Sequence, residues 1–390
     1  MRQWHKNTDA GVETGVYTMR LDPATGLVVS LQSRTSATEW VARCEGAAFG
    51  RPFVAGTQMQ ETPVPMAGAF LGDGSWRAVS PSGATELRYI FADDGFSIDA
   101  TLPRRTGPRT GLTLDLNHLD LATGTPWAEQ LTPVVIHVAE DTSYAYFIWH
   151  RSEHEHLVMA VDGPFAAWRL RYSYWGHRMT GFQLLSLADD VLDEGDARLR
   201  RVESLRIHVA FAGTVAQAME RARTLLGLAM VVPELTGVPV GGDMPIRIAG
   251  SPCAVRHILP DGAETPLAVT DAAARPVFVQ PGIHRIEAVS ANGRVHATRI
   301  LCHDDWQTLF TRCANFHAKH FQHECGAFFR AIDNMTLKPD RLTLEGLSYG
   351  DPFCPSSCRT GEFGGFAGWL LLKTMMLFGR DDRLMRAVDR

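Results

Sequence analysis

The sequence predicts a chain of mostly antiparallel β structure that changes to α-helix towards its C-terminal end. Short runs rich in aromatic and β-branched residues, separated by Gly, Pro or Asp, fill the chain up to about Gly213. A second group of such runs lies within residues 243–302. From Asp304 the apolar residues recur with a helical period. We therefore predict a large antiparallel β-sandwich, a small β-sandwich and a group of helices.

Size and charge narrow the class of protein. The chain has 390 residues, which is room for two or three domains of about 150 residues each. Its net charge is −5 with no basic block, which argues against a nucleic-acid partner. No apolar stretch approaches the ~18 residues of a membrane-spanning helix, so we expect no membrane partner. The pattern leaves the oligomeric state open.

The cysteines and the N-terminus bear on the compartment. Seven cysteines is an odd number, which favours reduced thiols and a cytoplasmic setting. The first residues, Met1–Asn7, lack the apolar core of a signal peptide. We expect a cytoplasmic protein, with export after removal of a signal as the alternative.

The predicted first domain covers residues 1–232 and opens with a hairpin. Val16–Leu21 alternates, Asp22–Gly26 has turn chemistry, and Leu27–Leu31 resumes the strand. Further strands are expected at Glu86–Phe91, Phe96–Leu102, Leu112–Leu116, Thr132–Val138, Ala145–His150, His156–Val161, Ala167–Tyr174, Phe182–Leu187 and Glu203–Phe211. The helix Thr214–Met230, with Thr214 as its N-cap, closes the domain.

A linker and a small β module follow. Pro233–Gly242 has the composition of a linker. Within residues 243–302, Asn292-Gly293 is a strong hairpin signal. Strands are expected at Pro245–Ile248, Ala254–Leu259, Val277–Val279, Ile283–Val289 and Val295–Leu301. The length suits an immunoglobulin-like sandwich, although the cysteine and tryptophan hallmarks are absent.

Residues 304–390 form the predicted helical part. Asp304 or Asp305 can cap a helix over Trp306–Phe329. After a loop to Thr360, an apolar helix over 363–378 ends at Gly379, and a third helix begins at Asp381.

This order of elements resembles carbohydrate-active enzymes in which a galactose-mutarotase-like supersandwich precedes an (α/α)6 toroid, the six-hairpin glycosidases. The hairpin Leu21–Leu31, the helix Thr214–Met230 and the segment Arg359–Trp369 carry the resemblance. It implies a large antiparallel β-supersandwich, a small immunoglobulin-like β-sandwich and the first helices of an incomplete toroid. The chain departs from the pattern because it holds few of the toroid's helices, and because the small β module is not universal in such enzymes.

The resemblance implies a glycoside hydrolase acting on an oligo- or polysaccharide. A polysaccharide lyase acting on a uronate is the first alternative, and a non-catalytic carbohydrate-binding or scaffolding protein is the second. The fold alone does not choose among them. Because the main catalytic carboxylate of similar enzymes comes from later helices, we expect the chain by itself to be inactive.

The loop before the apolar helix carries the candidate catalytic residues, Glu362 and Asp351. If the helix belongs to the inner ring of a toroid, Glu362 faces the funnel and can hold sugar hydroxyls or donate a proton. Its structural alternative is a carboxylate that stabilises the helix N-terminus. Asp351, in Tyr-Gly-Asp-Pro, is equally suited to a turn.

The same loop carries the candidate substrate-binding residues. Arg359 can clamp a carboxylate through two hydrogen bonds, which suits a uronate, or form an ion pair with Glu362 or Asp351. Aromatic rings can stack on the C–H faces of a sugar. The residues assigned to this contact are Tyr349, Phe353 and Phe363.

Two other clusters have weaker signals. Cys313, His317 and His320 share one predicted helix face, but their spacing fits no standard zinc signature, so we expect no metal and no cofactor. The segment His150–His156 is dense in titratable groups, and we favour a solvated turn over a ligand-binding loop.

Overall fold

The computed structural model describes residues 2–6, 9–41, 48–55, 61–102, 109–117, 132–165, 167–172, 179–185, 204–320, 322–323, 326–327, 374–379 and 382. The chain divides into two units. The first consists of residues 1–230, 250–253 and 288–296, and the second of residues 231–249, 254–287 and 297–390. Among the described residues, no helix is long and apolar enough to cross a membrane.

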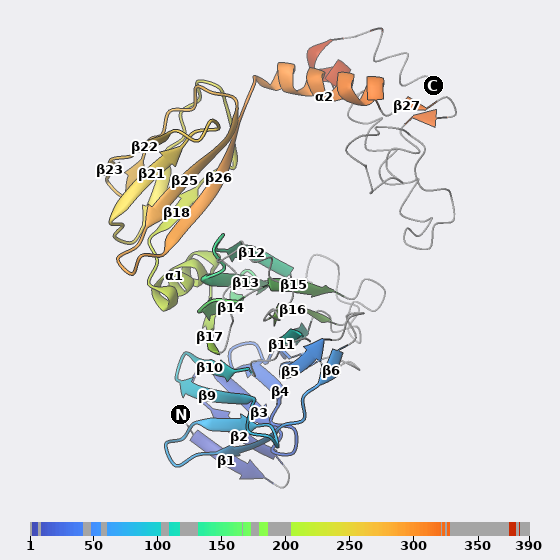
Figure 1. The fold of residues 1–390 in the computed structure, drawn as a ribbon, viewed down its shortest axis with the longest axis vertical. Helices are drawn as coiled ribbons and strands as arrows, with labels where there is room; N and C mark the ends of the chain where they lie inside the picture. Colours follow the sequence, from blue (N-terminus) through green and yellow to red (C-terminus); the bar gives the residue numbers. More distant parts are fainter. Residues whose placement is uncertain are drawn as a thin grey trace. The chain divides into compact units, whose positions relative to one another are not determined.

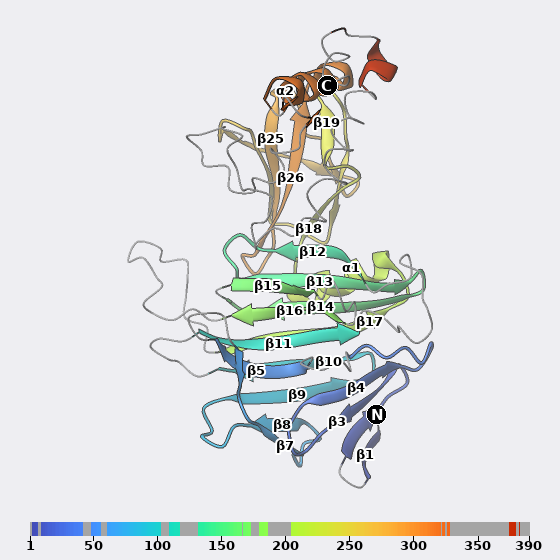
Figure 2. The same ribbon diagram turned by 90° about the vertical axis from the view of Figure 1, so that its right-hand side faces the viewer.

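The first unit contains two antiparallel sheets (Figures 1 and 2). The nine-stranded sheet has the order β1-β2-β3-β4-β5-β11-β16-β15, with β6 paired to β5. Its strands are β1 (Arg2–Lys6), β2 (Asp9–Glu13), β3 (Tyr17–Leu21), β4 (Val28–Ser33), β5 (Phe49–Ala55), β6 (Glu61–Pro63), β11 (Arg109–Asn117), β15 (Ala167–Tyr172) and β16 (Met179–Leu185).

The eight-stranded sheet has the order β12-β13-β14-β17-β10-β9-β8-β7. Its strands are β7 (Ala67–Phe70), β8 (Trp76–Val79), β9 (Glu86–Ala92), β10 (Gly95–Thr101), β12 (Thr132–Val138), β13 (Tyr144–Ser152), β14 (Glu155–Asp162) and β17 (Ser204–Ala212). One hydrophobic core joins the two sheets, as the stacking of Tyr17 from β3 on Phe211 from β17 illustrates. The predicted large antiparallel β-sandwich is confirmed.

Strand β14 is buried on both faces, which explains its nearly continuous apolar sequence. Leu157 and Met159 lie in the core between the sheets. Val158 and Ala160 point to the opposite face and are equally buried. Helix α1 (Val215–Leu226) packs against β14, β17 and β13 and covers part of that face (Figure 1).

The ends of α1 follow local chemistry. Thr214 is the predicted N-cap, and its side chain accepts a hydrogen bond from the Gln217 N–H at 3.1 Å. Gly227 ends the helix at φ 62°, a left-handed conformation that glycine adopts at little cost. The helix therefore stops at Leu226, four residues before the predicted Met230, and the chain continues as a strand.

A turn remote in sequence completes the first unit. Residues 288–296 contain the predicted Asn292-Gly293 turn, with Gly293 at φ 82°. The Ser290 N–H donates to the Arg294 carbonyl at 2.8 Å and closes it. The hairpin signal is confirmed, and the strands that it joins are β25 (Gly282–Val289) and β26 (Val295–His303).

The second unit contains a four-stranded sheet, β18-β20-β24-β23, and a five-stranded sheet, β19-β26-β25-β21-β22. Their further strands are β18 (Met230–Pro233), β19 (Gly237–Pro239), β20 (Ile246–Ala249), β21 (Ala254–Ile258), β22 (Glu264–Pro266), β23 (Val269–Thr270) and β24 (Ala273–Ala274). The segment Pro233–Gly242, predicted as a linker, instead contains β19, which pairs in parallel with β26. Val277–Val279, predicted as a strand, makes only an isolated bridge from Val277 to Asp243.

Helix α2 (Trp306–His320) follows β26 and is shorter than the predicted Trp306–Phe329. Its cap is Asp305, which accepts from the Thr308 N–H at 3.0 Å, whereas Asp304 pairs with Arg312. A two-stranded sheet of β27 (Gln322–His323) and β28 (Gly326–Ala327) lies beyond it. Residues 374–378 are helical, and Gly379 follows at φ 102°. The toroid remains a prediction.

Candidate functional site

The predicted catalytic and substrate-binding residues lie outside the described residues. These are Tyr349, Asp351, Phe353, Arg359, Glu362 and Phe363. Their roles therefore stay predictions.

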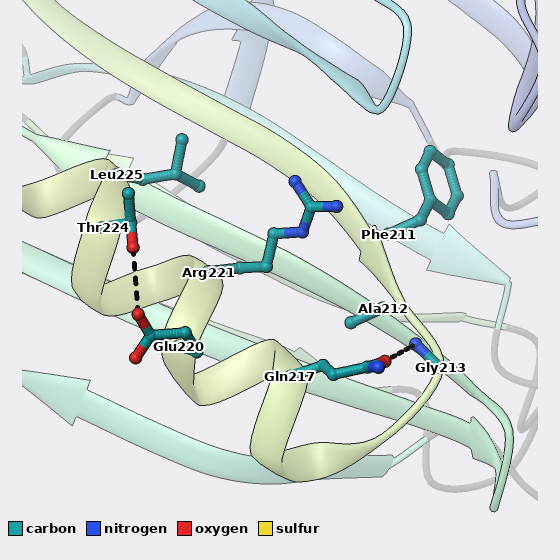
Figure 3. A pocket seen from close by; sticks show the side chains of 8 residues that line it. All are labelled: Phe211, Ala212, Gly213, Gln217, Glu220, Arg221, Thr224 and Leu225. Carbon is teal, nitrogen blue, oxygen red and sulfur yellow. Dashed lines mark hydrogen bonds between the residues drawn. The ribbon is translucent and has the colours of Figure 1, made fainter. Parts of the chain in front are cut away.

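The first unit has a cleft of about 490 Å³ beside α1 (Figure 3). One wall is the end of β17 and the residues that follow it, and the other is a polar face of α1. The lining residues are Phe211, Ala212, Gly213, Gln217, Glu220, Arg221, Thr224 and Leu225. The cleft forms here because the chain turns directly from β17 into α1, so the helix lies back over the strand that precedes it.

The side chains of the cleft hold one another in place. Gln217 accepts a hydrogen bond from the Gly213 N–H at 3.0 Å through Oε1, which leaves its amide N–H groups for a ligand (Figure 3). Arg223 donates to Glu220 through Nε at 2.8 Å, and Thr224 donates to Glu220 at 3.4 Å. Arg221 pairs with Asp94 of the β9–β10 turn.

This arrangement suits binding better than bond cleavage. Glu220 is the one carboxylate among the residues that line the cleft, and it is already paired with Arg223. General acid–base cleavage of a glycosidic bond needs two carboxylates on opposite sides of that bond. An amide, a guanidinium and a hydroxyl can instead hold a polar, hydroxyl-bearing ligand.

A second cleft of about 470 Å³ lies over the strands β10, β14 and β17. Two carboxylates line it, Asp99 and Asp162, and each is engaged by an arginine. Arg206 donates to Asp99 through Nη2 at 2.8 Å, and Arg294 pairs with Asp162. With both carboxylates committed to guanidinium groups, the charges largely cancel, and this cleft has no free acid–base pair.

The segment His150–His156 contains the predicted solvated turn at Glu153–His154, between β13 and β14, but its last two residues are not solvated. His154 is exposed at the tip, but Glu155 and His156 are buried. Glu155 accepts from Ser36 Oγ at 2.6 Å and from Thr38 Oγ1 at 2.8 Å, so both of its oxygens are used structurally. The sequence could not reveal the burial of Glu155 because these two hydroxyls come from a turn 117 residues and more away.

The imidazoles of His150 and His156 approach each other within this segment. Nδ1 of His150 lies 3.2 Å from Nε2 of His156. Burial lowers the pKa of His156, and the nearby His150 lowers it further. Within the described part of the chain, no three Cys, His, Asp or Glu side chains gather as metal ligands, and Cys313 is exposed.

Comparison with known proteins gives a likeness of fold. No family model matches the chain, and no curated protein matches it. A solved polysaccharide lyase matches with a TM-score of 0.61 and 15% identity, over 97% of this chain and 59% of that chain. This likeness extends over nearly the whole chain, which spans less than two thirds of the lyase's length.

Two further solved structures match more weakly. A galactose mutarotase related enzyme from Lactobacillus acidophilus has a TM-score of 0.30 and 9% identity, over 53% of this chain and 97% of that chain. A family GH92 inverting mannosidase from Bacteroides thetaiotaomicron has a TM-score of 0.29 and 10% identity, over 97% of this chain and 51% of that chain. At these scores neither supports an argument.

Proposed function

We propose that the chain is part of a carbohydrate-active enzyme that acts on an oligo- or polysaccharide. The observation that supports this is the likeness of fold to a polysaccharide lyase over 97% of the chain, together with the confirmed β-sandwich that the resemblance implied. The described residues contribute the sandwich and the small β module, and the catalytic groups belong to the helical part.

Between the two reaction classes, the same likeness favours the lyase. A lyase removes the proton beside a uronate carboxylate and so needs a cation that neutralises this carboxylate. Arg359 suits that role because a guanidinium binds a carboxylate through two parallel hydrogen bonds. The hydrolase is the second candidate, and it rests on Glu362 and Asp351 as the acid and its partner carboxylate.

The two classes differ in where the oxygen of the new chain end comes from. Because the chain by itself is expected to be inactive, the experiment uses the whole enzyme of which we propose that it is part. That enzyme is incubated with a uronate-containing polysaccharide and with a neutral one in oxygen-18 water. A lyase gives an ultraviolet-absorbing unsaturated uronate with no label incorporated, whereas a hydrolase incorporates one labelled oxygen per cleavage. Arg359→Ala should abolish cleavage of the uronate polymer, and Arg275→Ala, at an exposed ion pair with Asp243, should leave it unchanged.

A non-catalytic saccharide-binding protein is the remaining candidate, and the cleft beside α1 favours it. Its polar lining without a carboxylate pair fits ligand binding. In that case calorimetry with oligosaccharides gives heats of binding without any cleavage, and Arg221→Ala weakens binding. The absence of both binding and cleavage across neutral and uronate polymers would refute the proposed function in all its forms.

A further inference from the structure

Residues 288–296, here called the turn segment, are bound to the rest of the first unit by several polar contacts. The Ala229 N–H donates to Ser290 Oγ at 2.7 Å. Asn292 Nδ2 and Arg294 Nη1 both donate to the Leu226 carbonyl, at 3.1 and 2.7 Å. The carbonyls at the end of α1 are left unpaired by the helix itself, so the turn segment satisfies one of them.

Four aromatic side chains, here called the histidine stack, form the centre of this contact: His137 of β12, Tyr144 and Tyr146 of β13, and His296 of the turn segment. The imidazoles of His137 and His296 lie face to face, with centroids 4.1 Å apart and planes 8° apart. The ring of Tyr146 stacks on His137 at 5.0 Å, and its hydroxyl lies 2.9 Å from Nε2 of His296.

The hydrogen bonds of the stack assign a tautomer. The Tyr144 hydroxyl donates to the Val295 carbonyl at 2.9 Å. The same hydroxyl oxygen lies 3.2 Å from Nε2 of His137, and because its hydrogen is already used, the imidazole must donate. Nε2 of His137 therefore carries a hydrogen, so in the neutral ring Nδ1 is the nitrogen that would take up a second proton.

Three of the four rings of the stack are buried, and His137 is half-buried. Tyr144 is 0% exposed, and Tyr146 and His296 are 2% exposed. Burial lowers the pKa of His137 to about 4. Burial also holds the pKa of His296 well below its usual range, and the facing His137 lowers it further. Both rings are neutral near pH 7.

Charged and titratable groups face the stack from the neighbouring elements. Asp162 of β14 pairs with Arg294 of the turn segment, whose guanidinium lies 5.8 Å from the centre of the Tyr144 ring. Arg206 and His208 follow on β17, where they pair in register with Asp162 and Ala160. Asp141 precedes β13, and its negative charge adds to burial in raising the pKa of Tyr144.

We propose that the histidine stack is an acid-sensitive latch, in which proton uptake by the two imidazoles releases the turn segment from the sandwich. The docked state requires neutral rings, whereas the released state takes up protons with ordinary affinity. The ratio of docked to released molecules therefore falls about tenfold per pH unit for each histidine, from about pH 6.5 down to the lower pKa of the docked state.

Hydrogen exchange of the whole chain tests the latch. Exchange of the turn segment is measured by mass spectrometry between about pH 7.5 and 4.5 and corrected for the intrinsic pH dependence of exchange. We expect protection to fall at least about tenfold per pH unit below about pH 6.5, while β3 and β10, which contain no histidine, stay protected. Protection that is flat with pH, or that falls equally in β10, would overturn the proposal.

Matched variants identify the titrating groups. His137→Phe combined with His296→Phe keeps two flat rings but takes up no proton, so the pH dependence should vanish. His208→Gln, outside the stack, should leave it intact. If the double variant does not fold, His137→Phe alone should reduce the slope by about tenfold per pH unit. The latch would be refuted if either phenylalanine variant kept the full pH dependence of protection. It would also be refuted if Asp162→Asn by itself abolished that dependence, because the effect would then belong to the ion pair between Asp162 and Arg294.

Discussion

Each unit of the molecule contains a pair of histidines in close contact, and the two pairs are held together differently. In the first unit, His137 and His296 stack face to face and bind tyrosine hydroxyls. In the second unit, Nε2 of His257 lies 2.7 Å from Nδ1 of His284, with the rings 35° apart. Nε2 of His284 donates to the Gln280 carbonyl at 2.7 Å, so His257 must be the donor within the pair.

The difference determines what a proton does to each pair. A proton on Nδ1 of His257 leaves the hydrogen bond between the two histidines in place, because Nε2 still donates. In the stack, protons on both rings would place two positive charges face to face in a buried site, where screening is weak. Two pairs with the same residue composition should therefore differ in acid sensitivity, and the stack should respond more steeply.

The largest effect on stability is expected from a substitution in the aromatic core of the first unit, away from its histidine pair. Trp149 of β13 is 0% exposed and lies in the core between the sheets. Trp149→Ala should lower the free energy of unfolding of the first unit by about 3–5 kcal/mol, because it removes a large ring and leaves a cavity. Chemical denaturation followed by circular dichroism measures this. Trp168→Ala, at a partly buried ring, should cost clearly less, and equal costs would contradict the assignment of the core.

The next largest effect is expected when the hydrogen bond between His257 and His284 in the second unit is removed. His284→Leu leaves the Nε2–H of the buried His257 and the Gln280 carbonyl without these partners. We expect a loss of about 3 kcal/mol from two unmade hydrogen bonds, seen as faster hydrogen exchange in β21 and β25. The exposed His154 provides the control, and His154→Leu should change neither strand.

Acid should weaken the second unit moderately. Burial lowers the pKa of His257, and the charge of His284 lowers it further. A base whose pKa is lowered by folding stabilises the folded state above its ordinary pKa of about 6.5 and loses that contribution as the pH falls below this value. We expect up to ~1.4 kcal/mol per pH unit, measured by urea denaturation followed through exchange in β25. If the stability of the second unit fell with pH as steeply as the docking of the histidine stack, the two pairs would not differ in acid sensitivity as we expect.

The smallest effect concerns the helix beside the first cleft. Thr214→Ala removes the side-chain oxygen that accepts from the Gln217 N–H, and it should cost about 1 kcal/mol. Thr214→Ser keeps the oxygen and should be nearly neutral. Denaturation midpoints of the two variants check this, and a neutral alanine variant would show that packing on β14 alone holds the helix.

Much of the sandwich could be predicted because its signals are local. The turn Asp22–Gly26, the strand Thr132–Val138 and the cap Thr214 each depend on neighbouring residues, and each is found. Strand β5 was missed because Pro52 lies within it, and proline argues against a central strand. Its pairing with β4 is reduced to Phe49 opposite Val28, while β11 holds it from the other side.

Non-local pairing explains what the sequence did not reveal. The prolines and glycines of Pro233–Gly242 have loop chemistry, yet Gly237 pairs with Leu301. His137 and His296 likewise come together only because the turn segment reaches β12, and no motif links residues so far apart. The carboxylates of the 349–366 loop fall outside the described residues, so the sequence remains their sole support.

The turn segment also has a consequence for how the protein is made. The first unit is not complete until His296 has left the ribosome, although its last strand ends at Ala212 and α1 at Leu226. At ~5–20 residues per second, the 66 residues from 230 to 296 take roughly 3–13 s to synthesise. During that interval His137, Tyr144 and Tyr146 lack their covering residues, so the nascent sandwich presents an aromatic patch to chaperones before it closes.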